Sequence, residues 1–98
     1  MIRPGISWVV KSVKIYTTPY CPYCVRAKRL LDRKGVSYEE IDVARDDEAR
    51  IALSERTGLR TVPQIFIGEE HVGGSDDLHA LEAQGKLDAM LQELLRPQ

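Results

Sequence analysis

The stretch VKIYTTPYCPYC, residues 13–24, decides the fold. Polar and apolar residues alternate over 13–16, and this alternation predicts a β-strand. Pro22 suits the first position of a helix, where its missing N–H has no partner to lose, and the helix is predicted to run to about Lys34 with Gly35 as its stop. The apolar face of this helix is formed by Cys24, Ala27, Leu31 and, beside it, Leu30. The chain therefore passes from strand to helix at its cysteine pair.

Three further strands and three further helices are predicted in the rest of the chain. The strands are expected over 38–43, 64–67 and 70–72, with a tight turn at Gly68-Glu69 joining the last two as a hairpin. The first of these helices is capped by Asp46 or Asp47, ends at Gly58 and carries an apolar stripe of Ala49, Ala52 and Leu53. The second is capped by Ser75 and ends at Gly85. The last stops near Pro97, and its apolar residues are Leu87, Met90, Leu91 and Leu94. A strand–helix–strand unit implies a parallel pair, and the hairpin adds antiparallel strands. The sequence therefore predicts an α/β fold with a mixed four-stranded sheet flanked by helices.

Composition and charge exclude several classes of protein. The 98 residues are enough for one domain, and 43% hydrophobic with 30% charged residues is typical of a globular domain. No apolar run approaches the ~18 residues that cross a bilayer, and no export signal is visible, so the expected location is the cytoplasm. A net charge of −1 argues against a nucleic-acid-binding module.

Charge is unevenly distributed along the chain. Residues 1–38 hold eight Lys/Arg and one acid, whereas residues 39–98 hold six Lys/Arg and fourteen acids. The basic excess gathers on the first predicted helix, at Arg26, Lys28, Arg29, Arg33 and Lys34. The simpler interpretation is a solvated helix face, and a docking surface is the alternative.

The two cysteines, Cys21 and Cys24, point to redox chemistry. A bridge between them would close a ring of four residues and join no distant elements, so it would stabilise the fold little. Cys21 falls at the junction of strand and helix, where free backbone N–H groups and the helix dipole favour thiolate over thiol. Cys24 lies on the same face within disulfide range, and it is predicted to be the more buried thiol with the higher pKa. A Cys-x-x-Cys at such a turn in a βαβ pattern is a specific redox signal.

A structural zinc site is the alternative use of this cysteine pair. Tetrahedral zinc would need two more ligands, and the only histidines are His71 and His79, neither of which has a partner at zinc-finger spacing. Both are predicted to be surface histidines, with His79 on an exposed helix face. No metal site is therefore predicted.

Two segments are candidates for the substrate side. The residues alone predict a trans Val62–Pro63 bond, because most X-Pro bonds are trans. If this bond were cis beside the cysteines, the backbone of Val62 could pair with an extended thiol-containing peptide. In residues 73–77, two glycines permit close backbone approach, a helix N-terminus offers N–H donors to a carboxylate, and the acids could attract an ammonium group. On the residues alone, a plain glycine-rich turn is the simpler interpretation.

Three motifs together resemble the bacterial dithiol glutaredoxins: CPYC at 21–24, TVPQIFI at 61–67 and GGSDDL at 73–78. The resemblance extends from about Val13 to Leu95. It implies the thioredoxin-like fold, a cis bond before Pro63 and glutathione as the partner thiol. Residues 13–98 are accordingly expected to form a glutaredoxin domain, and 1–12 an N-terminal extension of unknown role.

The resemblance also implies a role for individual residues. Cys21 would be the nucleophile and Cys24 the resolving thiol. The family's glutathione contacts fall here on Tyr23, Arg50, Thr61, Val62, Pro63, Gly74, Ser75, Asp76 and Asp77. Of these, Tyr23 would flank the tripeptide, and Thr61 and Val62 would hold its cysteinyl backbone. Ser75 and Asp76 would hold its γ-glutamyl end, with Asp77 near the amine. Arg50 would bind its glycyl carboxylate.

Two positions depart from the family pattern. Thr18 stands where the family usually has a lysine, three residues before the first cysteine, and this removes one cation for the glycyl carboxylate. Whether Arg50 or Arg60 compensates is open. Ser75 replaces a cysteine that is common in relatives, so no third thiol is available.

The predicted function is a glutathione-dependent thiol–disulfide oxidoreductase acting on protein–glutathione mixed disulfides and protein disulfides. Glutathione would be a cosubstrate and not a permanently bound cofactor, glutathione reductase an indirect partner, and the protein a monomer. Three alternatives stay open. They are an electron donor coupled to thioredoxin reductase, a 2Fe-2S carrier in which two chains each supply Cys21 alongside two glutathiones, and, less expected, a zinc-binding module. Pro22 argues against the cluster, because relatives that hold clusters usually carry a small residue there.

Overall fold

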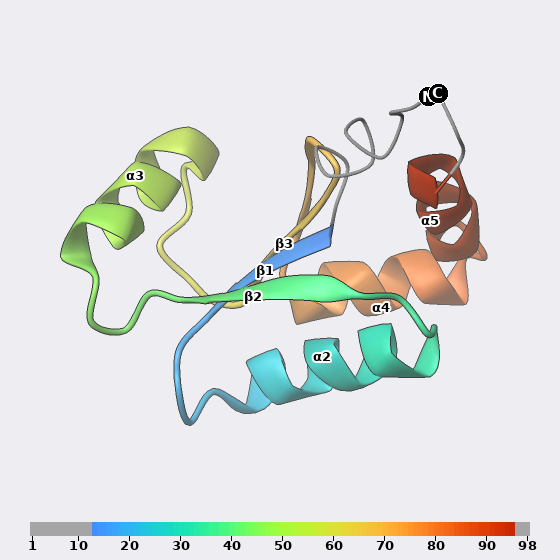
Figure 1. The fold of residues 1–98 in the computed structure, drawn as a ribbon, viewed down its shortest axis with the longest axis horizontal. Coiled ribbons are helices and arrows are strands. Elements are labelled where there is room, and N and C mark those ends of the chain that lie inside the picture. Colours follow the sequence, from blue (N-terminus) through green and yellow to red (C-terminus); the bar gives the residue numbers. More distant parts are fainter. Residues whose placement is uncertain (1–12, 96–98) are drawn as a thin grey trace, which may run out of the picture.

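In a computed structural model, which describes residues 13–95, the chain forms one four-stranded sheet in the order β2-β1-β3-β4 (Figure 1). The strands are β1 (Val13–Thr17), β2 (Tyr38–Asp42), β3 (Gln64–Ile67) and β4 (Glu70–Gly73). The helices are α2 (Pro22–Arg33), α3 (Asp47–Thr57), α4 (Ser75–Ala83) and α5 (Leu87–Leu95). Strand β1 pairs parallel with β2 and antiparallel with β3, and β3 pairs antiparallel with β4. The predicted mixed sheet is confirmed.

Helices α2 and α4 lie side by side along the sheet, and α3 lies apart from them, beyond the end at which β1 runs toward α2 (Figure 1). The main core fills the space between the sheet and α2, α4 and α5. Its fully or nearly buried members are Val13, Ile15, Ala27, Leu30, Leu31, Ile65, Ile67, Leu78, Leu87 and Leu91. Because side chains alternate along a strand, Phe66 of β3 faces away from this core. The Arg56 guanidinium of α3 lies over its ring, 4.4 Å from the centroid, so α3 covers part of the other face.

Several local predictions hold, and two are wrong. Asp46 caps α3 by accepting a hydrogen bond from Ala49 N–H at 3.0 Å, and Gly58 ends it in the left-handed conformation. In the apolar stripe predicted for α3, however, only Leu53 is buried and Ala52 is exposed, because this helix makes few contacts with any other helix or strand. Ser75 is not the cap of α4: the cap is Gly74, whose N–H donates to Asp77 Oδ2 at 3.0 Å. The stop predicted near Pro97 and the extension predicted over 1–12 lie outside the described residues.

Candidate active site

Cys21 is the N-cap residue of α2, directly after the turn that follows β1. Its Sγ accepts a hydrogen bond from the Cys24 backbone N–H at 3.3 Å. As a thiol it also faces the Val62 carbonyl oxygen, 3.9 Å away. The sulfur is half-buried, and it lies where the helix dipole and unpaired N–H groups stabilise negative charge. The local sequence explains this placement, because Pro22 occupies the first helical position and leaves Cys21 as the cap.

Cys24 occupies the first turn of the same helix, and its side chain is 1% exposed. Both thiols are free. Burial, followed by the neighbouring Cys21 sulfur, raises the pKa of Cys24 to about 12. The buried thiol with the high pKa is therefore at the position that the spacing predicts, and near neutral pH it is protonated.

Two tyrosines flank the half-buried sulfur. Tyr20 precedes it, is fully exposed and has φ of 68°, a conformation uncommon for a residue with a side chain. Tyr23 is 54% exposed, and the Arg26 guanidinium lies 5.8 Å from its ring centroid. Sequence reasoning selected Tyr23 and missed Tyr20, although a tyrosine after Pro19 and directly before the thiol was a usable signal.

One cation of α2, Lys28, is paired with a carboxylate of the sheet. Lys28 donates to Glu40 Oε2 on β2 at 3.0 Å, and the Thr17 hydroxyl of β1 donates to the same oxygen at 2.8 Å. The lysine, more than the hydroxyl, lowers the pKa of Glu40, and the carboxylate in turn raises the pKa of Lys28. This charge is thus paired, and the cluster links α2, β1 and β2 just behind the cysteines.

The loop before β3 contributes the backbone that faces Cys21. The Val62–Pro63 peptide bond is cis, so the trans expectation from the residues alone is wrong and the expectation from the family resemblance is confirmed. Gln64 is buried at the start of β3, and its Nε2 donates to the carbonyls of Leu59 at 3.1 Å and Thr61 at 3.0 Å. Sequence reasoning missed Gln64. Its one signal was a polar residue opening an otherwise apolar strand.

The glycine pair between β4 and α4 packs against this loop. A Cβ added to Gly74 would lie 3.6 Å from the Pro63 carbonyl oxygen, an ordinary van der Waals distance, so the two segments are in direct contact. Gly73 has φ of 117°, and a Cβ there would collide with the Asp77 carboxylate. Asp77 therefore orders the turn through its cap to Gly74, and Asp76 beside it, exposed like Asp77, makes no such bond.

The two histidines are more enclosed than predicted. His79 is half-buried, and its Nδ1 donates to the Ser75 carbonyl at 2.8 Å, with the buried Ser75 hydroxyl 3.4 Å away. His71 is half-buried against Phe66, with ring centroids 4.9 Å apart. Within 13–95, no three His, Cys, Asp or Glu residues gather into a group that could hold a metal ion.

Arg50 and Arg60 both line a hollow of about 530 Å³ beside α3. Both also line a smaller hollow with Thr61 and Val62, which connects them to the loop opposite Cys21. Among the ion pairs of the described residues, none includes either arginine. Thr18, where a lysine was expected, is half-buried in the turn after β1.

Residues 13–72 match the family model described as Glutaredoxin. The chain belongs to the glutaredoxin family. It is 62% identical over 79 residues to a glutaredoxin of Pseudomonas aeruginosa, covering 81% of this chain and 94% of that protein. It is 51% identical over 81 residues to glutaredoxin 3 of Escherichia coli K12, covering 83% and 98%. The crystal structure of a buckwheat glutaredoxin–glutathione complex superposes with a TM-score of 0.82 at 34% identity, covering 92% of this chain and 87% of that one.

Glutaredoxins are thiol–disulfide oxidoreductases, so the chain has this activity at the level of the family. The thioredoxin-like glutaredoxin fold predicted from the motifs is confirmed. In the fold, the three motifs meet at one end of the sheet: the CPYC turn faces Val62, and the glycine pair closes on Pro63. None of the helices over 13–95 has the length and apolarity needed to cross a membrane.

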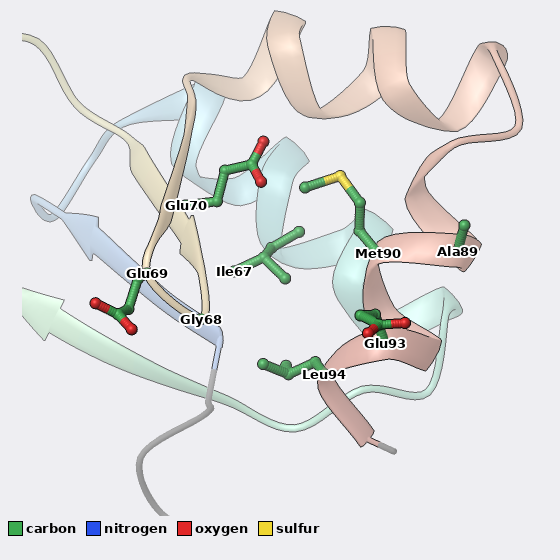
Figure 2. Close-up of a pocket in the computed structure, with 8 residues that line it drawn as sticks. All are labelled: Ile67, Gly68, Glu69, Glu70, Ala89, Met90, Glu93 and Leu94. Atoms are coloured by element: carbon green, nitrogen blue, oxygen red, sulfur yellow. The ribbon is translucent and has the colours of Figure 1, made fainter. Parts of the chain in front are cut away.

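A further hollow lies away from this centre. It is bounded by the turn between β3 and β4 and by α5, with Ile67, Met90 and Leu94 pointing into it and Glu69 at its margin (Figure 2). It contains none of the residues that the sequence selected, and it is not part of the candidate active site.

The raised pKa of Cys24 predicts a loss of stability at alkaline pH. The unfolded chain ionises this thiol near the ordinary cysteine pKa of 9.0, but the folded chain, with a pKa of about 12, keeps it protonated to higher pH. The unfolded state then binds fewer protons, so the free energy of unfolding falls between these values by up to about 1.4 kcal/mol per pH unit.

Chemical denaturation of the reduced protein and of Cys24→Ala, followed by circular dichroism from pH 8 to 11, measures this effect. We expect the stability advantage of the wild type to shrink above pH 9. The raised pKa values of Lys28, Lys34 and Tyr38 act in the same direction, but they are common to both proteins and largely cancel in the difference. A constant difference over this range would contradict a buried, protonated Cys24.

Proposed function

We propose that the protein is a glutathione-dependent thiol–disulfide oxidoreductase that reduces protein–glutathione mixed disulfides and protein disulfides, as a monomer in the cytoplasm. One observation carries the proposal: the Cys21 sulfur, at the N-terminus of α2, faces the backbone of Val62 in the loop against which Gly74 packs. The site thus combines a reactive sulfur, an extended backbone segment and the N-terminus of a second helix. A small peptide that contains a thiol fits this combination.

The first half of the cycle is a single exchange at sulfur. The Cys21 thiolate attacks the glutathionyl sulfur of the substrate, a new disulfide forms between Cys21 and glutathione, and the protein thiolate leaves and takes up a proton. A second glutathione, as thiolate, then attacks the glutathionyl sulfur on Cys21. Glutathione disulfide departs and the Cys21 thiolate is restored.

Protein disulfides use both cysteines. Cys21 attacks one substrate sulfur and forms a mixed disulfide, while the other substrate sulfur leaves as a thiol. Cys24 then loses its proton and attacks the Cys21 sulfur, which releases the second substrate thiol and leaves a Cys21–Cys24 disulfide. Their placement in the first turn of one helix, with Cys24 N–H on Cys21 Sγ, supports this second step.

Glutathione is proposed to bind along the loop and across to α4. The backbones of Thr61 and Val62 would pair with its cysteinyl unit as an added strand. The first turn of α4, at Ser75 and Asp76, would take the γ-glutamyl carboxylate and amine. The exposure of Asp76 supports this role, whereas Asp77 would act mainly through the turn that it caps.

The other end of the tripeptide is proposed to meet the two arginines beside α3. Arg50 and Arg60 line the hollow next to Thr61 and Val62, and guanidinium groups bind carboxylates by paired hydrogen bonds. Arg60 would thus supply the positive charge that the family's lysine provides at the position of Thr18. Tyr23 would cover the bound peptide from the cysteine side.

The test is turnover of a small glutathione mixed disulfide coupled to glutathione reductase and NADPH. We expect steady turnover that requires glutathione. Reduction of the oxidised protein by an NADPH–thioredoxin reductase couple, with no response to glutathione, would instead favour the electron-donor alternative. A coloured dimer after anaerobic expression with iron would favour the cluster carrier.

Gln64 is predicted to set the affinity for glutathione without touching it. Gln64→Leu removes two hydrogen bonds to the Leu59 and Thr61 carbonyls but also removes a buried Oε1 that has no partner within the described part of the chain. The opposing terms leave the free energy of unfolding changed by about 1 kcal/mol or less. Because the loop from Leu59 to Thr61 would no longer be held by these bonds, we expect KM for the glutathione mixed disulfide to rise several-fold with little change in kcat. An unchanged KM would show that Gln64 does not position the loop.

A further inference from the structure

Three arginines of α2, none of them assigned to the glutathione site, line one hollow. Arg26, Arg29 and Arg33 recur at the spacing of one helical face, and they meet Ser75, Asp76 and His79 of α4 around a volume of about 450 Å³. The hollow thus runs between two helices that lie side by side along the sheet (Figure 1). We call it the arginine groove.

The charge of the arginine groove is largely uncompensated. Asp76 is its one lining carboxylate. Two nearby carboxylates are committed elsewhere, since Glu40 pairs with Lys28 at 3.0 Å and Glu82 with Lys34 at 2.9 Å. No ion pair found among residues 13–95 involves Arg29 or Arg33. Adjacent guanidinium groups without partners favour an anionic occupant, and planar guanidinium groups suit carboxylates.

The position of the groove relative to the sulfur limits what can occupy it. Arg29 and Arg33 follow Cys21 by eight and twelve residues on the helix that Cys21 caps. At 1.5 Å per residue they lie about 12 and 18 Å along the axis from the reacting sulfur. An extended peptide spans this distance in roughly four to six residues, at about 3.3 Å each.

We propose that the arginine groove docks an acidic segment of the disulfide-bearing protein substrate, with Asp or Glu side chains about four to six residues from the reacting cysteine. This rests on the proposed function, and it extends the substrate class from glutathione to the protein attached to it. Glutathione is too short to fill the groove when its γ-glutamyl end is at Ser75 and Asp76. The protein's net charge of −1 and the carboxylate of Asp76 disfavour a nucleic acid, whose phosphates would extend well beyond three arginines.

The test uses peptides that carry one glutathionylated cysteine and, four to six positions from it, three consecutive residues that are either all Glu or all Gln. One pair of Glu and Gln peptides has these residues on the N-terminal side of the cysteine, and a second pair has them on the C-terminal side. In one of these two pairs, we expect kcat/KM at low salt to be about 3–10-fold higher for the Glu peptide than for the Gln peptide. This preference should disappear at 0.5 M salt. The double variant Arg29→Gln/Arg33→Gln should lose the preference and keep its turnover of a small glutathione mixed disulfide. Arg45→Gln, an exposed arginine outside the groove, is the matched control and should keep both.

Several outcomes would overturn the docking proposal: no preference for Glu in the wild type, a preference that survives in the double variant, or an equal loss in the Arg45→Gln control. If no peptide is turned over, the proposed function itself fails. Fluorescence polarisation of labelled Glu and Gln peptides with serine in place of cysteine then measures the groove alone. Competition by a short oligonucleotide but not by the Glu peptide would assign the groove to nucleic acid and reject the proposal.

Discussion

Replacing Cys21 by serine is expected to reduce turnover of every disulfide substrate to the uncatalysed rate, whereas Cys24→Ser keeps turnover of glutathione mixed disulfides. A serine hydroxyl does not ionise near neutral pH and cannot form the disulfide on which both routes depend. In the proposed cycle, only protein disulfides need Cys24. The Cys24→Ser variant should therefore accumulate a stable mixed disulfide with a protein substrate, detectable by its added mass.

The pair of variants provides its own control. Both substitutions change one sulfur to oxygen, and circular dichroism of each variant checks that the fold survives. Equal loss of mixed-disulfide turnover in both would reject the separate roles of the two thiols. Loss in Cys24→Ser alone would reverse them.

The second large effect is expected from removing Arg50 and Arg60 together. Hydrogen bonds to a charged group are each worth about 1.5–3 kcal/mol, and 1.4 kcal/mol corresponds to a factor of ten in affinity. Because these side chains are partly solvated, we expect the lower end, with Arg50→Ala/Arg60→Ala raising KM for a glutathione mixed disulfide about 10–100-fold and changing kcat little. Steady-state kinetics of the double variant and of both single variants measure the effect.

A modified substrate shows whether the arginines act on the glycyl carboxylate. Glutathione with its glycine amidated has no charge at that end, so the wild type should discriminate against its mixed disulfide and the double variant should not. Arg45→Ala is the charge-matched control for each of the two single variants. If the double variant still discriminated fully against the amidated substrate, the glycyl carboxylate would bind elsewhere. Neither arginine would then compensate for the lysine that is absent at position 18.

The residues alone predict the centre of the site well, because the determinants are local. An alternating strand, a proline at the first helical position and the cysteine before it are enough to make Cys21 a helix cap and to bury Cys24 three residues later. The strand–helix–strand order likewise determines the parallel pair. Nothing local, however, selects the cis bond at Pro63, which was predicted only through the family resemblance.

Other features depend on contacts between distant segments, and sequence patterns did not reveal them. Gln64 matters because it bonds carbonyls of the preceding loop from inside the sheet. Ser75 is a favourable cap by residue type, but the chain uses Gly74, whose N–H donates to the Asp77 carboxylate. Ala52 follows the helical period but is exposed, because α3 makes few contacts with any other helix or strand.

The protonated state of Cys24 has a consequence for which reaction prevails in the proposed cycle. Burial is the largest cause of the raised pKa of Cys24 and does not depend on the state of Cys21, so this thiol supplies little thiolate at neutral pH and its attack on the neighbouring sulfur is infrequent. A glutathionyl group on Cys21 then survives long enough for a free glutathione molecule to collect it. The balance between one-cysteine and two-cysteine chemistry is therefore a competition between a rare internal deprotonation and the cellular concentration of glutathione, and it should move toward the two-cysteine route as glutathione is depleted.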